Sequence, residues 1–130
     1  MRLSDLLTAF AGLFGACAVA LGAVGSHVLR ERLAAVDYDM FALATVYMLV
    51  HASVLFGCGI ASRRAERPWP FIIAGILIIA GILLFCGGLM GRAAFGMPAL
   101  GRFAPVGGSA FILAWLAVAV AGFLNYWRSR

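Results

Sequence analysis

Long apolar stretches separated by short clusters of charge form the pattern of this chain. Charged side chains fall at positions 2–5, 30–39, 63–67, 92, 102 and 128–130. Between these positions lie four stretches almost free of charge, and each is about as long as the roughly 20 apolar residues that a helix needs to cross a bilayer. The pattern therefore predicts four membrane-spanning helices, at about residues 4–29, 40–62, 71–90 and 106–126.

Four such helices predict an all-α fold, an integral-membrane four-helix bundle that forms a single transmembrane domain over residues 1–130. The segment 30–39 between the first two spans is too polar to cross a bilayer. It is either an ordinary loop or a short amphipathic helix lying at the membrane interface. The second interpretation rests on apolar residues that share one helical face: Leu29, Leu33, Val36 and Met40.

Composition supports a membrane protein and excludes a nucleic-acid-binding one. The chain is 65% hydrophobic and 12% charged, with a mean hydropathy of +1.05, whereas soluble domains are about half apolar and about a quarter charged. All ten basic residues are arginine and the net charge is +5. Because these arginines are dispersed among short segments, they form no continuous basic face for a nucleic acid. We expect them to contact the lipid bilayer at its anionic headgroups.

The arginines also predict the orientation of the chain. Four spans place both termini on one side of the membrane. That side carries six arginines, Arg2, Arg63, Arg64, Arg67, Arg128 and Arg130, against four on the other, Arg30, Arg32, Arg92 and Arg102. Because cytoplasmic segments carry the excess of basic residues, we expect cytoplasmic termini.

Small residues recur along the first span at helical spacing, at Gly15, Ala18, Gly22 and Gly25. Such a stripe lets a neighbouring backbone approach closely in lipid. It predicts that the first span packs in the centre of the bundle. Gly107 and Gly108 open the fourth span and are helix-packing candidates in the same way.

Three cysteines, Cys17, Cys58 and Cys86, lie within the apolar spans and lack the spacing of metal ligands. We interpret them as buried thiols that act as small hydrophobic side chains. The sequence predicts no disulfide, no metal site and no cofactor.

Polar residues inside a membrane are costly, so they are the first candidates for function. Tyr47 and His51 are four residues apart and therefore share a helical face. His51 lies about 16 Å into the second span at 1.5 Å per residue, near the bilayer midplane. It is either a neutral histidine that hydrogen-bonds a neighbouring helix or a group that binds a ligand or handles a proton. The sequence favours the first interpretation.

His27 ends the first span, and Arg30 follows it by about one turn. They either cap the corner of the helix or contact a headgroup or substrate, and the sequence favours the cap.

The two histidines also raise the question of haem. Two axial ligands must lie at one depth, but His27 and His51 differ by roughly 10 Å or more at the 1.5 Å rise of a helix. This difference argues against a bis-histidine haem within one chain.

No constellation of catalytic residues is present. The spans contain no acidic residue, and we find no nucleophile motif and no phosphate-binding loop. The sequence therefore predicts that the protein is not an enzyme.

Four short motifs occur in a recognisable order: "LGAVGSHVL" at 21–29, "YMLVH" at 47–51, "FCGGLM" at 85–90 and "APVGG" at 104–108. In order and spacing they resemble the blocks of a family of small four-span bacterial membrane proteins, domain of unknown function 423, which is related to transmembrane protein 256. The resemblance implies an inner-membrane protein with no established activity. His27, Tyr47, His51 and Gly108 match the family blocks.

Several positions depart from the family blocks, mostly by loss of a hydroxyl or amide: Met48, Cys86, Gly88, Met90 and Ala104. These losses favour a structural role for this chain. We therefore expect a non-enzymatic accessory or assembly subunit, which associates with other membrane protein subunits or with itself. The alternative is a small-molecule or lipid binder, or a permease, that acts as an oligomer through Tyr47 and His51.

Overall fold

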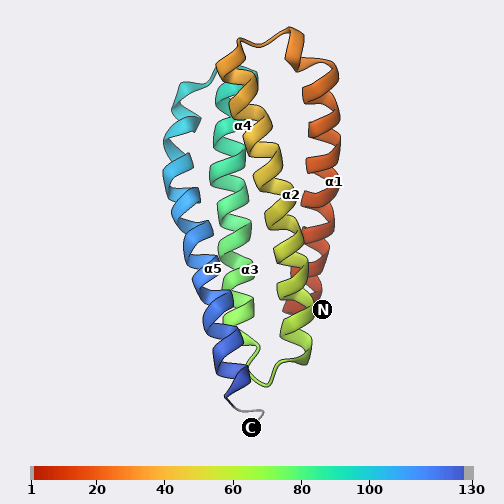
Figure 1. Ribbon diagram of the computed structural model, residues 1–130, viewed down its shortest axis with the longest axis vertical. Helices are drawn as coiled ribbons and strands as arrows, with labels where there is room; N and C mark the ends of the chain where they lie inside the picture. Colours follow the sequence, from red (N-terminus) through yellow and green to blue (C-terminus); the bar gives the residue numbers. More distant parts are fainter. Residues whose placement is uncertain (1, 128–130) are drawn as a thin grey trace.

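The computed structural model of the protein describes residues 2–127, which form helices and no strand. Four long helical segments run up and down, so that the start of α1 and the end of α5 lie at the same end of the bundle (Figure 1). Each is long and apolar enough to cross a membrane. The predicted all-α four-helix membrane bundle is therefore confirmed. The elements are α1 (Leu3–His27), η1 (Leu29–Glu31), α2 (Ala35–Arg64), α3 (Trp69–Gly81), η2 (Ile82–Cys86), α4 (Gly87–Phe95), η3 (Pro98–Phe103) and α5 (Ala104–Tyr126).

The first helix lies at the edge of the bundle. α1 packs along α2 and touches α3 only briefly, whereas α2 also packs against α3, α4 and η2. Only 17% of the most apolar window of α1 is buried, against 39% for α2. The expectation that the first span occupies the centre is therefore wrong. Of its small residues, Gly22 and Gly25 contact α2, and most of the remaining surface of α1 faces the bilayer.

Contacts at the two ends hold α1 against α2. A side chain at Gly59 would collide with Thr8, so this glycine lets the two backbones meet. Beside it, Arg63 and Asp5 form an ion pair of 2.6 Å. Toward the opposite end, Gly25 lies under the ring of Phe41.

The connection between the first two spans contains no separate surface helix. After α1 the chain makes one 3₁₀ turn, η1, and α2 already begins at Ala35 instead of near Met40. Asp37 lies in the first turn of α2, where a carboxylate is stabilised by the positive end of the helix dipole. The prediction of a separate amphipathic helix over 30–39 is therefore wrong, because the second half of this segment belongs to α2.

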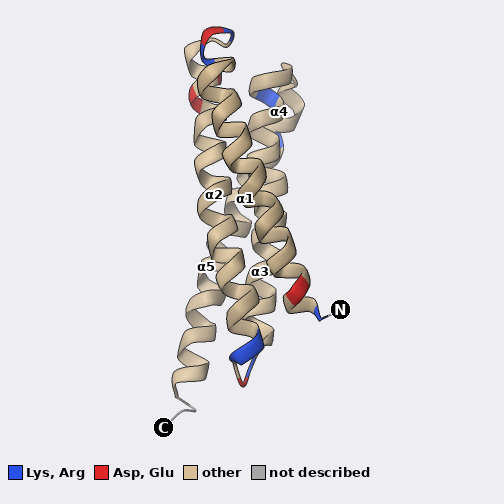
Figure 2. Ribbon diagram, turned by 90° about the vertical axis from the view of Figure 1, so that its right-hand side faces the viewer, with Lys and Arg blue, Asp and Glu red and all other residues tan. Residues whose placement is uncertain are grey.

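The third membrane crossing is built from α3, η2 and α4. It begins after Pro68 and continues to Phe95, past the expected end at Met90. Gly96 stops it with a left-handed backbone, φ +60°, which glycine adopts without steric cost, and Pro98 then opens η3. Arg92 lies in the last turn of α4, where its charge suits the negative end of the dipole. Charged residues gather at the two ends of the bundle (Figure 2).

The cysteines have different surroundings. Cys58 and Cys86 are buried, as expected, and Cys86 is fully so. Cys17 is exposed on the outer face of α1. The expectation that all three thiols are buried is wrong for Cys17, because α1 is peripheral.

Candidate functional site

The third crossing widens locally into a turn of π-helix, η2. The backbone N–H of Gly87 donates to the carbonyl of Ile82, five residues earlier, so this turn holds one residue more than an α-helical turn. Turns of this kind are rare and occur frequently at functional sites. Phe85 lies within η2, and its side chain lines a cavity.

Helix α5 approaches η2 at Gly107. A Cβ atom there would overlap the backbone nitrogen of Phe85, so only glycine permits this approach. One turn later, Phe111 projects from α5 toward Gly81, where an added Cβ would come within 2.5 Å of the Phe111 ring. These two glycines therefore set the position of α5 and of its aromatic side chains.

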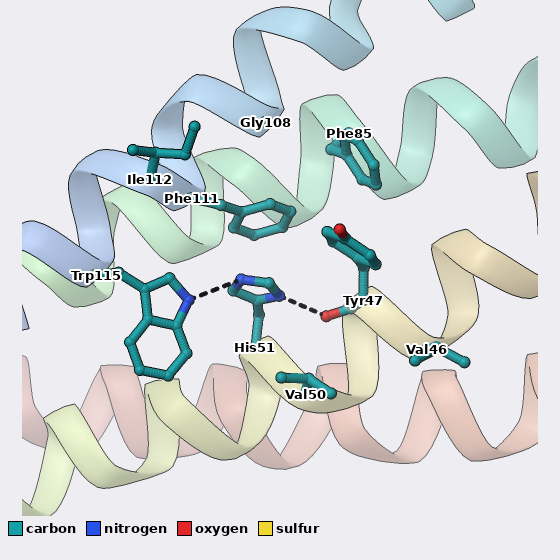
Figure 3. Close-up of a pocket in the computed structure, with 9 residues that line it drawn as sticks. All are labelled: Val46, Tyr47, Val50, His51, Phe85, Gly108, Phe111, Ile112 and Trp115. Atoms are coloured by element: carbon teal, nitrogen blue, oxygen red, sulfur yellow. Dashed lines mark hydrogen bonds between the residues drawn. The ribbon is translucent and has the colours of Figure 1, made fainter.

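A cavity of about 440 Å³ lies between α2, η2 and α5. The helices α2 and α5 do not pack along each other, and the space between them is bridged by side chains (Figure 3). Val46, Val50 and Ile112 line the cavity and are also exposed on the outside of the bundle. The cavity therefore opens sideways, toward the bilayer. Its lining residues are Val46, Tyr47, Val50, His51, Phe85, Gly108, Phe111, Ile112 and Trp115.

His51 is the buried polar residue of this cavity. Its Nδ1 lies 2.8 Å from the carbonyl oxygen of Tyr47, and its Nε2 lies 3.4 Å from the indole Nε1 of Trp115. A carbonyl only accepts and an indole N–H only donates. Nδ1–H therefore donates to Tyr47, and Nε2 accepts from Trp115, which fixes a neutral imidazole with its proton on Nδ1.

The imidazole also stacks on an aromatic side chain. The ring centroids of His51 and Phe111 are 3.7 Å apart, with the planes inclined by 20°. Both ring nitrogens and one ring face are thus occupied by the protein itself. This arrangement matches the interpretation of His51 as a histidine that bonds a neighbouring helix.

Tyr47 lies beside His51 on α2, with the two ring centroids 5.7 Å apart. Its ring stacks on Phe85, with centroids 4.9 Å apart, and its hydroxyl points into the space between Phe85 and Phe111 (Figure 3). Apart from the imidazole of His51, no acidic or basic side chain is among the described residues that line the cavity. Within residues 2–127 no group of three His, Cys, Asp or Glu side chains is placed to hold a metal ion. Because both ring nitrogens of His51 already bond within the protein, the cavity is suited to a neutral molecule.

Of the residues expected from the sequence, Tyr47, His51 and Gly108 meet in this cavity. His27 and Arg30 do not. His27 is exposed at the last residue of α1, and Arg30 is exposed in η1. The sequence interpretation missed Phe85, Phe111 and Trp115. A signal for two of them existed, because Phe111 and Trp115 are four residues apart, as Tyr47 and His51 are.

The expected packing residues divide into two groups. The first group packs within the bundle: Ala18 is buried, and a Cβ added at Gly22 would lie 3.4 Å from Thr45. Gly25 is in tight contact with Phe41, and Gly107 with Phe85. At Gly15 an added Cβ would meet nothing within 4 Å, so this part of the stripe does not pack within the bundle. At Gly108 the nearest atoms of Phe85 lie at ordinary contact distance, 3.7 Å, and the glycine leaves space in the cavity.

The departures from the family blocks lie outside the cavity. Met48 and Cys86 are buried in the core, and Met90 is buried on α4. Gly88 instead lets α4 pack on the backbone of Leu100, where an added Cβ would lie 2.7 Å from the carbonyl oxygen. Lost hydroxyl and amide groups at these positions therefore do not weaken a site built around Tyr47.

The fold and the cavity define a class: small polytopic membrane proteins, four-helix bundles with a lateral aromatic cavity. Comparison with known proteins narrows this class. The chain belongs to the family described as protein of unknown function DUF423, whose model matches residues 21–108. The family resemblance is thus confirmed, and the match includes Tyr47, His51, Phe85 and Gly108.

Three relatives illustrate the similarity. The UPF0382 inner membrane protein YgdD of Escherichia coli K12 is 30% identical over 90% of this chain and 88% of its own. The UPF0382 membrane protein YwdK of Bacillus subtilis is 33% identical over 80% and 85%. A third, SSP2132 of Staphylococcus saprophyticus, is 32% identical over 82% and 87%. No solved structure matches the chain significantly.

The names of the family and of these relatives describe membrane proteins of unknown function and indicate no enzymatic activity. The relative in Escherichia coli is named an inner membrane protein. The chain is accordingly an integral membrane protein with four spanning helices.

Proposed function

We propose that this protein is a non-enzymatic membrane protein that binds a small hydrophobic molecule in the cavity between α2, η2 and α5. The observation that carries the proposal is the cavity itself. It holds about 440 Å³, is walled by aromatic side chains and opens toward the bilayer. Ligand sites of this size with apolar walls and a few polar groups are typical of small-molecule binding.

The cavity also accounts for features that helix packing alone does not require. Gly108 leaves its space empty although a Cβ atom would fit there. Lateral opening gives a membrane-dissolved molecule a path that avoids water. Binding without chemistry fits the engagement of both His51 nitrogens within the protein.

A titration with decylbenzene in detergent micelles tests the proposal. Trp115 lines the cavity, whereas Trp69 and Trp127 lie at helix ends, so the indole N–H signal of Trp115 in an NMR spectrum reports occupancy. We expect a saturable shift of this signal in the wild-type protein. Gly108→Leu should abolish saturation, because the new side chain fills the cavity. Gly57→Leu is the matched control, since Gly57 is exposed on α2 with nothing within 4 Å of an added Cβ. Equal shifts in both variants would contradict the proposal.

A second candidate function is association with another membrane subunit or a second copy. It is supported by a hollow on the outer face of α1 and α2, lined by Ala11, Gly12, Gly15, Leu49, Ala52, Ser53 and Phe56. No other described helix covers Gly12 and Gly15, and exposed small residues let helices approach closely in lipid. In mild detergent, Gly15→Leu should convert a wild-type complex on a native gel into monomer. A monomeric wild-type protein would contradict this candidate.

We also propose an inner-membrane location with both termini in the cytoplasm. The arginine distribution supports this orientation, since more arginines belong to the terminal side than to the side with η1 and η3. Contacts with anionic headgroups at both ends would follow from the exposed positions of Arg30, Arg64 and Arg102.

A further inference from the structure

One polar group of the cavity has no partner within the described part of the chain. The hydroxyl of Tyr47 makes no hydrogen bond to residues 2–127 and points between Phe85 and Phe111 (Figure 3). By contrast, the side chains of Thr45, Ser53 and Ser109 all donate to a carbonyl of their own helix. The hydroxyl of Tyr47 stands at the far end of the aromatic ring, so it does not reach the carbonyl groups of its own helix.

The depth of Tyr47 makes this hydroxyl costly. It is the thirteenth of the 30 residues of α2, so it lies about 18 Å from the first residue of the helix at 1.5 Å per residue. That position is inside the hydrocarbon region, where water does not reach to accept a hydrogen bond. An O–H group in such a place is stabilised by an acceptor that arrives with a ligand.

The aromatic side chains around the Tyr47 hydroxyl determine which ligand shape fits the cavity. The centroids of Tyr47 and Phe111 are 6.2 Å apart, and those of Phe85 and Phe111 are 5.7 Å apart. At these spacings the rings contact one another and form one aromatic wall, on which a flat ring packs more closely than a bulky saturated one. The absence of charged groups among the lining residues excludes a charged ligand, which would be left unpaired.

We propose that the cavity binds the carbonyl-bearing ring of a lipid-soluble quinone, with the Tyr47 hydroxyl donating a hydrogen bond to a carbonyl oxygen. A quinone joins the three required properties, because it is flat, neutral and a hydrogen-bond acceptor. Its apolar tail leaves through the lateral opening at Val46, Val50 and Ile112. This inference rests on the proposed function and adds the chemical class of the ligand.

The test compares two probes with the same tail. One is decylubiquinone, a benzoquinone with a ten-carbon chain, and the other is decylbenzene, which lacks the oxygens. Both are titrated into the full-length protein in micelles, and saturation is followed at the Trp115 indole signal. We expect the wild-type protein to bind the quinone about fivefold more tightly or better, the value of one neutral hydrogen bond.

Tyr47→Phe keeps the ring and removes the donor, so it should reduce the preference for the quinone to about one while leaving decylbenzene affinity unchanged. Tyr38→Phe is the matched control, because Tyr38 lies outside this cavity, and it should keep the preference. Equal binding of the two probes to the wild-type protein, or a preference that survives Tyr47→Phe, would overturn the inference and leave the proposed function standing. Binding of neither probe would overturn both.

Discussion

Gly107 and Gly122 lie on the same helix, α5, and differ only in what surrounds them. An added Cβ at Gly107 would overlap the backbone of Phe85, whereas at Gly122 it would meet nothing within 4 Å. A backbone atom held in a helix cannot move aside as the end of a flexible side chain can. At the scale of single residues, position therefore decides which glycines hold the bundle together.

This difference gives a prediction for two alanine variants. Gly107→Ala should destabilise the protein by about 1–3 kcal/mol, the cost of forcing extra atoms into a packed contact. Gly122→Ala should leave stability unchanged or raise it by up to about 1 kcal/mol, because alanine is the better helix former. Unfolding by SDS titration in micelles, followed by circular dichroism, measures both. A Gly107→Ala variant as stable as Gly122→Ala would show that α5 does not approach η2 this closely.

At the scale of elements, η2 is the irregular part of the third crossing. Its extra residue lets α3 and α4 keep their own buried faces, with Ile78 buried before the turn and Met90 after it. Phe85 within the turn is directed to the cavity. A regular α-helix over the same residues would rotate one of these faces away from the core, since each residue adds about 100°.

Deleting one residue tests this account. Leu83 lies in η2 and is 59% exposed, so its deletion should convert the wide turn into an α-helical one, keep the protein folded and weaken decylbenzene binding. Ile76 lies in regular α3 and is 52% exposed. Its deletion should rotate the following residues by about 100° and prevent folding. Yield and unfolding of the two variants are compared, and equal damage would contradict the role of η2.

At the scale of the whole molecule, the four crossings are unequally packed. α2 and the third crossing share the core, α1 covers one side of α2, and α5 covers the third crossing. The cavity arises because α5 and α2 stay apart, bridged by His51, Phe111 and Trp115. The connection after α2 and the start of α1 lie at one end, and η1 and η3 lie at the other (Figure 1).

Cysteine labelling tests this topology and the proposed orientation together. Glu66→Cys and Met97→Cys place thiols at opposite ends of the bundle. In intact cells stripped of the outer membrane, a membrane-impermeant maleimide should label Met97→Cys at once and Glu66→Cys only after lysis. The wild-type protein is the control, because its three cysteines lie within the spans. Labelling of Glu66→Cys in intact cells would reverse the orientation, and labelling of both would contradict the topology.

Much of the fold could be predicted from the sequence. The number of spans and the helical class follow from apolar length, because lipid leaves a backbone no alternative to internal hydrogen bonding. The pairing of Tyr47 with His51 follows from helical spacing. The family follows from four short motifs.

Other features depended on tertiary contacts. Gly15 belongs to the same stripe as Gly22 and Gly25, yet only Gly22 and Gly25 pack within the bundle. A stripe of small residues shows which face of a helix can pack closely, but it does not show which other helix packs there. The π-turn at 82–86 likewise carries no distinct sequence signal, because its residues are as apolar as those around it.

The sequence by itself determined that this chain crosses the membrane four times, since hydrophobic length is a local property that needs no partner. It also determined that the polar residues of the second span share a face. Only the tertiary structure decided that Phe85, Phe111 and Trp115 join them around a cavity, because this depends on how closely Gly81 and Gly107 let the helices approach. The physical reason is that contact distance between helices is a property of pairs of surfaces, and no single segment encodes it.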